Sequence, residues 1–139
     1  MTTKASVEDR LAILELLADY ADAVNQRDGD AWGALWAENG VWDLGEDAGL
    51  APIQGRAAIR AMWEAAMPAF PDVVFLAHLG KLTVTGDSAK LRSYTSEAFT
   101  DPADGNRRRD LGQYDDDLIR VDGEWRFLKR RFRYLYRGH

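Results

Sequence analysis

Residues 110–136 read DLGQYDDDLIRVDGEWRFLKRRFRYLY, and this stretch decides the fold. It consists of two long segments separated by Asp122-Gly123, a pair that readily adopts the positive backbone angles of a two-residue type I′ turn. Such a turn places Val121 directly opposite Glu124. The stretch is therefore predicted to form an antiparallel hairpin.

Regular pairing outward from that turn predicts the partners of the charged residues. It sets Asp116 opposite Lys129 and Asp115 opposite Arg130. Opposite charges that face each other across two strands contribute about 0.2–1 kcal/mol per pair. We therefore expect a hairpin that is stabilised by matched charges.

Length and composition indicate one soluble domain over residues 1–139. The chain is 46% hydrophobic, contains no cysteine and has a formal net charge of −5. A negative charge argues against nucleic acid or an anionic membrane as a main partner. With no signal-peptide core and no apolar run of roughly 18–20 residues, the predicted location is cytoplasmic.

Helices are expected in the first half of the chain and strands in the second. Helical apolar spacing predicts helices over about 7–26, 31–36 and 56–67, with a short strand over 41–44. Residues 45–54 contain two glycines and a proline and are predicted to form a loop or lid. A period of two predicts strands over 73–85 and 89–99, ahead of the hairpin. The fold class is therefore α+β, a cone-shaped barrel in which a strongly curved, mainly antiparallel sheet wraps around the long first helix.

His78 is the candidate general base. If the strand over 73–85 is regular, His78 shares one face with Leu82 and Val84. An imidazole in such an apolar row can serve as a general base near neutral pH. The alternative is a buried histidine that hydrogen-bonds a backbone carbonyl.

Three further residues are site candidates, each with a structural alternative. Tyr20 lies on the apolar side of the first helix, where its hydroxyl either polarises a substrate oxygen or simply packs. Asn25 is near the end of that helix, where asparagine is common as a local cap. Asp43 lies on the short strand and either acts as a base or faces solvent.

Arg130 shares a predicted strand face with Leu128 and Phe132. An arginine there either extends to solvent or meets an acid or anion inside. Several other basic residues lie nearby among aromatic ones, a pattern that can bind nucleic acid. Because these charges fall on both strand faces and acidic residues lie opposite, an ion-paired edge is the preferred interpretation.

Three stretches resemble the SnoaL-like family of the nuclear transport factor 2-like superfamily. They are LLADYADAVNQRDGDAWGALWAENGVWD at 16–43, AHLGKLTVTGDSAKLRSY at 77–94 and GQYDDDLIRVDGEWRFLKR at 112–130. They are most similar to the group of scytalone dehydratase, bile-acid dehydratase and hexachlorocyclohexane dehydrochlorinase, and more distantly to ketosteroid isomerase. The resemblance implies a cystatin-like cone and a homodimer formed through the sheet.

In that group a histidine–aspartate dyad abstracts a proton, helped by a tyrosine or an arginine. The resemblance places His78 at the dyad histidine, Tyr20 at the helix tyrosine and Arg130 at the strand arginine. The dyad aspartate position falls on Asn25, whose amide barely stabilises an imidazolium. Comparison with ketosteroid isomerase sets Asp43 within one residue of the base position.

These residues and the resemblance predict binding of a small, largely apolar ring compound. The predicted chemistry is cofactor-free proton abstraction by a dehydratase-like lyase or an isomerase, and no metal or cofactor is expected. The alternative is a non-catalytic ligand-binding or dimerisation module that has lost the dyad carboxylate. The predicted walls of the ligand site are Trp42, Met62, Trp63, Phe75, Tyr94 and Tyr114.

Overall fold

The structure, a computed structural model, describes residues 6–138. Its helices are α1 (Val7–Gln26), α2 (Gly29–Ala34) and α3 (Arg56–Ala66), with 3-10 turns η1 (Glu46–Ala48) and η2 (Met67–Ala69). Its strands are β1 (Trp36–Asp43), β2 (Ile53–Gln54), β3 (Val74–Thr85), β4 (Ser88–Thr100), β5 (Arg107–Val121) and β6 (Glu124–Arg137). The predicted order of the main helices and strands is confirmed. The short strand β2 lies in the stretch predicted as a loop, and Trp36, predicted to end the second helix, begins β1.

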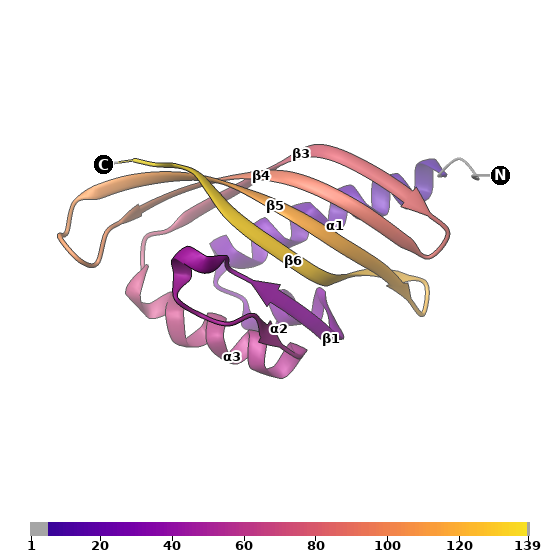
Figure 1. Cartoon of the computed structure of the whole chain (residues 1–139), viewed down its shortest axis with the longest axis horizontal. Helices are drawn as coiled ribbons and strands as arrows, with labels where there is room; N and C mark the ends of the chain where they lie inside the picture. The colour runs from indigo at the N-terminus through magenta and orange to yellow at the C-terminus, as the bar shows by residue number, and fades with distance from the viewer. Residues whose placement is uncertain (1–5, 139) are drawn as a thin grey trace.

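The strands form one sheet in the order β2-β1-β6-β5-β4-β3. All neighbours are antiparallel except β1 and β6, which are parallel. The helix α1 lies along one face of the long strands, while α2 and α3 lie beside β1 (Figure 1). The α+β class is confirmed, with a mixed sheet that stays open between its edge strands β2 and β3.

The helix α1 is fixed at its start by a side-chain cap. The Ser6 hydroxyl accepts a hydrogen bond from the Asp9 amide at 3.0 Å, which satisfies one of the free amides of the first turn. One side of the helix is buried against the sheet, through Ile13, Leu16, Leu17, Tyr20, Ala23 and Val24. Among the described residues, none of the helices combines the length and apolarity needed to cross a membrane.

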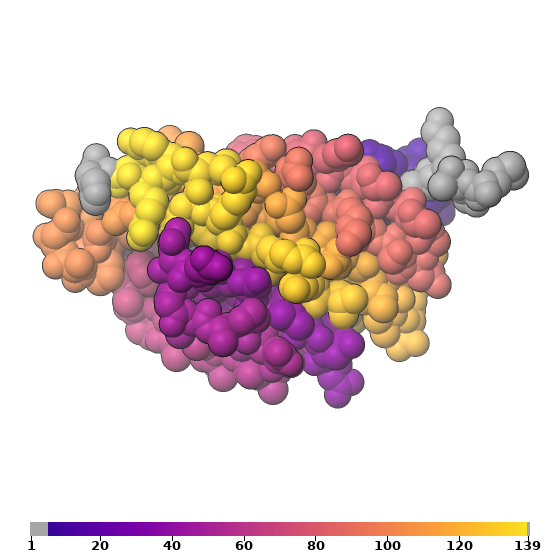
Figure 2. Space-filling model, viewed as in Figure 1, coloured from indigo at the N-terminus to yellow at the C-terminus, as the bar shows by residue number. Residues whose placement is uncertain are grey.

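Aromatic side chains fill the interior between α1, α2, α3 and the sheet. The rings of Trp32 and Trp63 are stacked, with centroids 4.8 Å apart. Trp36 and Phe127 are fully buried and lie against each other where β1 meets β6. On the molecular surface the segments of β1 and β6 also lie directly side by side (Figure 2). Because each aromatic ring buries a large apolar surface, this cluster accounts for much of the apolar area that the fold removes from water.

The hairpin turn is confirmed, but its predicted charge pairing is wrong. Val121 pairs with Glu124 as expected, whereas farther out Asp116 pairs with Arg130 and Asp115 with Arg131. The register shifts by one residue where Leu118 pairs with Phe127, because β6 carries an extra residue, a β-bulge, at that point. The bulge also separates Arg130 from the face of Leu128.

A second bulge moves His78 to the outer face of the sheet. The register of β3 and β4 shifts between Leu79 and Lys81. As a result Phe75 and Leu82 are both buried although they are seven positions apart, an offset that puts two residues of a regular strand on opposite faces, and His78 is exposed. The prediction that His78 shares a face with Leu82 is therefore wrong, because one extra residue reverses the alternation.

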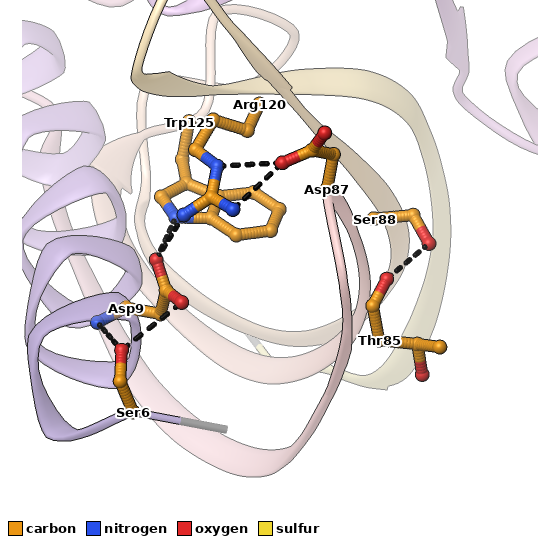
Figure 3. Close-up of polar contacts among 7 residues, drawn as sticks. All are labelled: Ser6, Asp9, Thr85, Asp87, Ser88, Arg120 and Trp125. Atoms are coloured by element: carbon orange, nitrogen blue, oxygen red, sulfur yellow. Dashed lines mark hydrogen bonds and ion pairs between the residues drawn. The ribbon is translucent and has the colours of Figure 1, made fainter. Parts of the chain in front are cut away.

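The start of α1 is joined to two strand turns by Arg120. Its guanidinium forms ion pairs with Asp9 of α1 and with Asp87 of the β3–β4 turn (Figure 3). It also lies over the Trp125 ring, 5.2 Å from the ring centroid, and the Trp125 indole donates to Asp9. Three elements that are distant in the sequence thus meet in one polar cluster at this end of the molecule.

Candidate functional site

An apolar pocket of about 160 Å³ lies between α1, the end of α3 and the inner face of the sheet. A cavity of about 150 Å³ can hold a benzene ring, so this volume suits a single ring. Larger hollows of about 280 and 650 Å³ also occur, and charged side chains, several of them ion-paired, make up much of their lining. The pocket is lined by Tyr20, Val24, Trp42, Trp63, Ala66, Met67, Phe70, Val73, Phe75, Glu97 and Tyr114.

Among the described residues, Glu97 is the one charged residue that lines this pocket. It continues an inward-facing row on β4 whose earlier members, among them Leu91, Ser93 and Thr95, are buried. Its carboxylate has no hydrogen bond or ion pair with any residue between 6 and 138. A carboxylate placed so lacks the partner that normally stabilises a charge away from bulk water.

The surroundings of Glu97 favour its protonated form. Burial and the negative charge of Asp110, its cross-strand neighbour, raise the pKa of Glu97 to about 7. Asp110 itself is compensated, because Arg108 Nε donates to its carboxylate at 2.8 Å. The pocket therefore holds a carboxyl group that takes up and releases a proton close to neutral pH.

The two tyrosine hydroxyls and the Trp42 indole form a second polar part of the pocket lining, an aromatic wall. Trp42 Nε1 donates to the Tyr114 hydroxyl at 3.0 Å. Burial raises the pKa of Tyr20, while the charge of Arg130 and the Tyr114 hydroxyl oppose that rise. Tyr20 consequently stays protonated at neutral pH and can act as a hydrogen-bond donor in the pocket.

Arg130 lies behind this aromatic wall and forms a buried ion pair. Its Nε and Nη2 donate to the two oxygens of Asp116 at 2.9 and 3.1 Å, and both side chains are fully buried. The guanidinium carbon lies 3.7 Å from the ring centroid of Tyr114 and 4.3 Å from that of Tyr20. Its Nη1 has no hydrogen-bond partner in the described part of the chain. The charge of Arg130, which Asp116 largely offsets, thus lies behind the wall, and Arg130 does not line the pocket.

Burial raises the pKa of Asp116 to about 6, and the adjacent Arg130 opposes the rise. Burial acts to lower the pKa of Arg130, but Asp116 outweighs it and the net pKa is raised. Both groups are therefore charged at neutral pH, as their bidentate geometry requires.

Asn25 is engaged by the backbone of β3 instead of by a histidine. Its amide nitrogen donates to the Phe75 carbonyl at 2.8 Å, and its amide oxygen accepts from the Phe75 amide at 2.7 Å. This pair of bonds needs one donor and one acceptor, which a carboxylate does not provide. The asparagine thus joins the end of α1 to the edge strand.

The structure brings some of the predicted site residues together and leaves others apart. Tyr20, Trp42, Trp63, Phe75 and Tyr114 share the pocket. The following residues do not line it: His78 and its cross-strand neighbour Tyr94, both exposed on the outer face, Met62 in the core, and Asp43, which accepts from the Gly45 amide. Residues 45–54 do not contribute to the pocket either, so a lid role for that loop has no support here.

The sequence analysis did not identify Glu97 as a site residue, and it assigned Asp116 to the wrong partner. For Glu97 an indication existed, because the alternation of Leu91, Ser93 and Thr95 along its strand places residue 97 on the same face. For Asp116 the bulge in β6 concealed its true partner. His139 lies outside the described residues. Among those residues, no three His, Asp or Glu side chains are gathered in a way that could hold a metal ion.

The sequence profile of the SnoaL-like domain matches residues 5–131. The chain belongs to the SnoaL-like family. An uncharacterized protein of Mycobacterium tuberculosis is 28% identical over 132 residues, which cover 94% of this chain and 88% of that protein.

Solved structures with the same fold include dehydratase-like and dehydrochlorinase proteins. A candidate scytalone dehydratase from Novosphingobium aromaticivorans superposes with a TM-score of 0.84 at 20% identity, covering 95% of this chain and 87% of the other. The hexachlorocyclohexane dehydrochlorinase LinA-type3 from Novosphingobium barchaimii gives 0.82 at 19% identity, with coverages of 95% and 90%. These likenesses establish the fold.

Proposed function

We propose that this protein binds a small, largely apolar ring compound in the pocket and transforms it by cofactor-free acid–base chemistry. The observation that carries the proposal is Glu97, an unpaired carboxyl group with a pKa of about 7 in an aromatic pocket sized for one ring. A general base works best when its pKa is close to the working pH. The reaction class is an elimination of the dehydratase type or an isomerisation.

In this proposal Glu97 takes a proton from a carbon of the ring. Negative charge then develops on the substrate, and Tyr20 donates a hydrogen bond to the oxygen or leaving group that receives it. Arg130 lies on the far side of the Tyr20 and Tyr114 rings, where its charge favours this redistribution. A base and an anion-stabilising wall thus face the same small volume.

The substitution Glu97→Gln tests the role of the base. It keeps the size of the side chain and removes the titrating group, so turnover should fall about 10²–10⁴-fold. We would incubate single-ring ketones, alcohols and halides with the protein in deuterated water, and follow deuterium uptake, loss of water or halide, and double-bond migration by NMR. Unchanged turnover in the variant would exclude Glu97 as the base.

Glu15→Gln is the matched control, because Glu15 is exposed on α1 and does not line the pocket. The control should keep full turnover. Both variants should also retain binding of the ring compound, since the aromatic walls are unchanged.

A non-catalytic ligand-binding module is the second candidate function. It is favoured by the position of His78 on the outer face and by the engagement of Asn25 with Phe75. It predicts saturable binding of a ring compound with no chemical change after long incubation.

We further propose that two copies pair through the outer face of the sheet. Exposed apolar side chains there come from all four long strands, namely Leu76, Tyr94, Leu111 and Tyr136. An apolar patch of this kind on an open sheet favours association. Light scattering at micromolar concentration should give twice the chain mass of 15.6 kDa, and a monomer mass would refute the pairing.

A further inference from the structure

The helix α1 ends at an arginine in an unusual backbone conformation. Arg27 has φ 56° and ψ 40°, and its amide donates to the carbonyls of Ala23 and Val24. Helices that end in this left-handed conformation usually have glycine there, because a side chain disfavours it. Only one other non-glycine residue among those described, Asp122, has a positive φ.

The side chain of Arg27 reaches across to the segment that closes the pocket. Its Nη2 donates to the Met67 carbonyl at 2.6 Å and its Nη1 to the Phe70 carbonyl at 2.9 Å. Met67 and Phe70 both line the pocket, as do Ala66 and Val73 at the ends of the same segment. The two hydrogen bonds therefore hold the 66–73 segment against the pocket.

The far end of the segment has separate anchors. The Asp72 carboxylate accepts from the amide and the hydroxyl of Thr100 on β4. The Phe70 ring packs edge-on against Phe99, with centroids 5.4 Å apart. Arg27 is thus the link between this segment and α1, while Asp72 and Phe70 attach it to the sheet.

The pocket is separated from an open groove by a thin part of the structure near Arg27. An open groove of about 650 Å³ between the end of α1 and α3 is lined by Arg27, Trp63 and Met67. Trp63 and Met67 also line the inner pocket. A single layer of side chains therefore divides the two spaces, and Arg27 fastens one part of that layer.

We propose that Arg27 is a specificity-determining residue that limits the pocket to single-ring ligands. By tying the 66–73 segment to α1 it keeps the pocket closed toward the neighbouring groove, and larger ligands are excluded. The inference rests on the proposed function only in treating this pocket as the ligand site, and it does not require catalysis. It also gives a reason for the presence of an arginine at a position whose backbone favours glycine.

The test compares Arg27→Gly with Asp122→Gly. Arg27→Gly removes both hydrogen bonds and relieves the left-handed backbone, so the fold should be retained, as circular dichroism would verify. Asp122→Gly gives the same backbone relief at the β5–β6 turn, where the side chain does not line the pocket. The pair thus separates the loss of the side-chain bonds from the change in backbone preference.

Calorimetric titration with phenol and 2-naphthol measures the size selection. In Arg27→Gly the ratio of the 2-naphthol Kd to the phenol Kd should fall about tenfold relative to the wild type, the scale expected for losing two hydrogen bonds. Hydrogen exchange of the 66–73 amides should become faster. Asp122→Gly should match the wild type in both measurements.

The possible failures are distinguishable. If both probes bind the wild type and the Kd ratio is unchanged in Arg27→Gly, the role of Arg27 is refuted and the ligand site stands. If neither probe binds the wild type, the ligand site fails, and the size selection fails with it.

Discussion

Asp116 and Glu97 are carboxylates on the inner faces of the neighbouring strands β5 and β4, and they differ in what surrounds them. Asp116 is fully buried and receives two hydrogen bonds from Arg130. Glu97 is less deeply buried, yet it has no such partner among the described residues and lines an open pocket. Both pKa values are raised, to about 6 and about 7 respectively.

The difference shows that burial alone does not indicate a catalytic acid or base. The charge of Asp116 balances the charge of Arg130 in the buried ion pair behind the aromatic wall. Between residues 6 and 138 no cation balances the charge of Glu97, so a ligand that delivers or accepts a proton would complete the site. The distinction lies in the partners of each carboxylate and in its access to the pocket, and substitutions can test it.

Arg130→Met should have the largest effect on stability. It leaves the Asp116 carboxylate buried without a partner, and breaking a buried ion pair in this way costs about 3–5 kcal/mol. Urea unfolding at pH 7 would measure the loss. The double variant Arg130→Met, Asp116→Leu should recover most of it, because no unpaired charge remains. A loss below about 1 kcal/mol in the single variant would contradict the structural role of the pair.

Glu97→Gln should have an intermediate effect that depends on pH. Because the folded-state pKa of Glu97 is about 7 and its ordinary value is 4.5, the folded protein holds this proton more tightly than the unfolded chain. The resulting stability is complete below pH 4.5 and is lost as the pH rises through 7. When the pH is raised from 4 to 8.5, the free energy of unfolding of the variant should therefore rise by about 1–3 kcal/mol relative to that of the wild type.

Urea unfolding of both proteins at the two pH values would measure that gain. Taking the difference between wild type and variant cancels the titration of the other groups. A difference that does not change with pH would show that Glu97 has an ordinary pKa, and the contrast with Asp116 would lose its basis.

Asp9→Asn should have the smallest effect, with the opposite pH dependence. Burial acts to raise the pKa of Asp9, but hydrogen bonds from Ser6 and Trp125 and the charge of Arg120 lower it below 3.8 overall. Its contribution to stability is therefore present above pH 4 and is lost as the pH falls through the folded-state pKa. The variant should be slightly less stable than the wild type at pH 7, and the difference should shrink at pH 3 and in high salt. A difference that grows at pH 3 would contradict this assignment.

The sequence predicts only part of the contrast between Glu97 and Asp116. The row on β4 that ends at Glu97 alternates regularly, so the inward direction of Glu97 follows from its spacing. The pairing of Asp116 with Arg130 does not, because counting from the turn assigns Asp116 to Lys129. The predicted register of β6 is wrong by one residue, and a shift of one residue moves a side chain to the opposite face of a strand.

His78 illustrates the same limit on β3. Gly80 stands where the register shifts, and a side chain there would meet the Tyr94 ring at 2.8 Å and the Arg92 carbonyl at 3.0 Å. Glycine inside a strand often marks a bulge, so the sequence contained an indication of the irregularity. The glycine alone does not tell which residues of β3 point to the other face of the sheet.

The sequence by itself determined the α+β class, the order of the main helices and long strands, the Asp122-Gly123 turn and the SnoaL-like family, because these depend on local periodicity and on matched motifs. Only the tertiary structure decided that His78 faces outward, that Arg130 meets Asp116, and that Glu97 has no partner beside an aromatic pocket. Bulges form where packing between elements requires an extra residue, and partners of buried charges come from strands that pair at long range. Neither is encoded in the local pattern of a single strand.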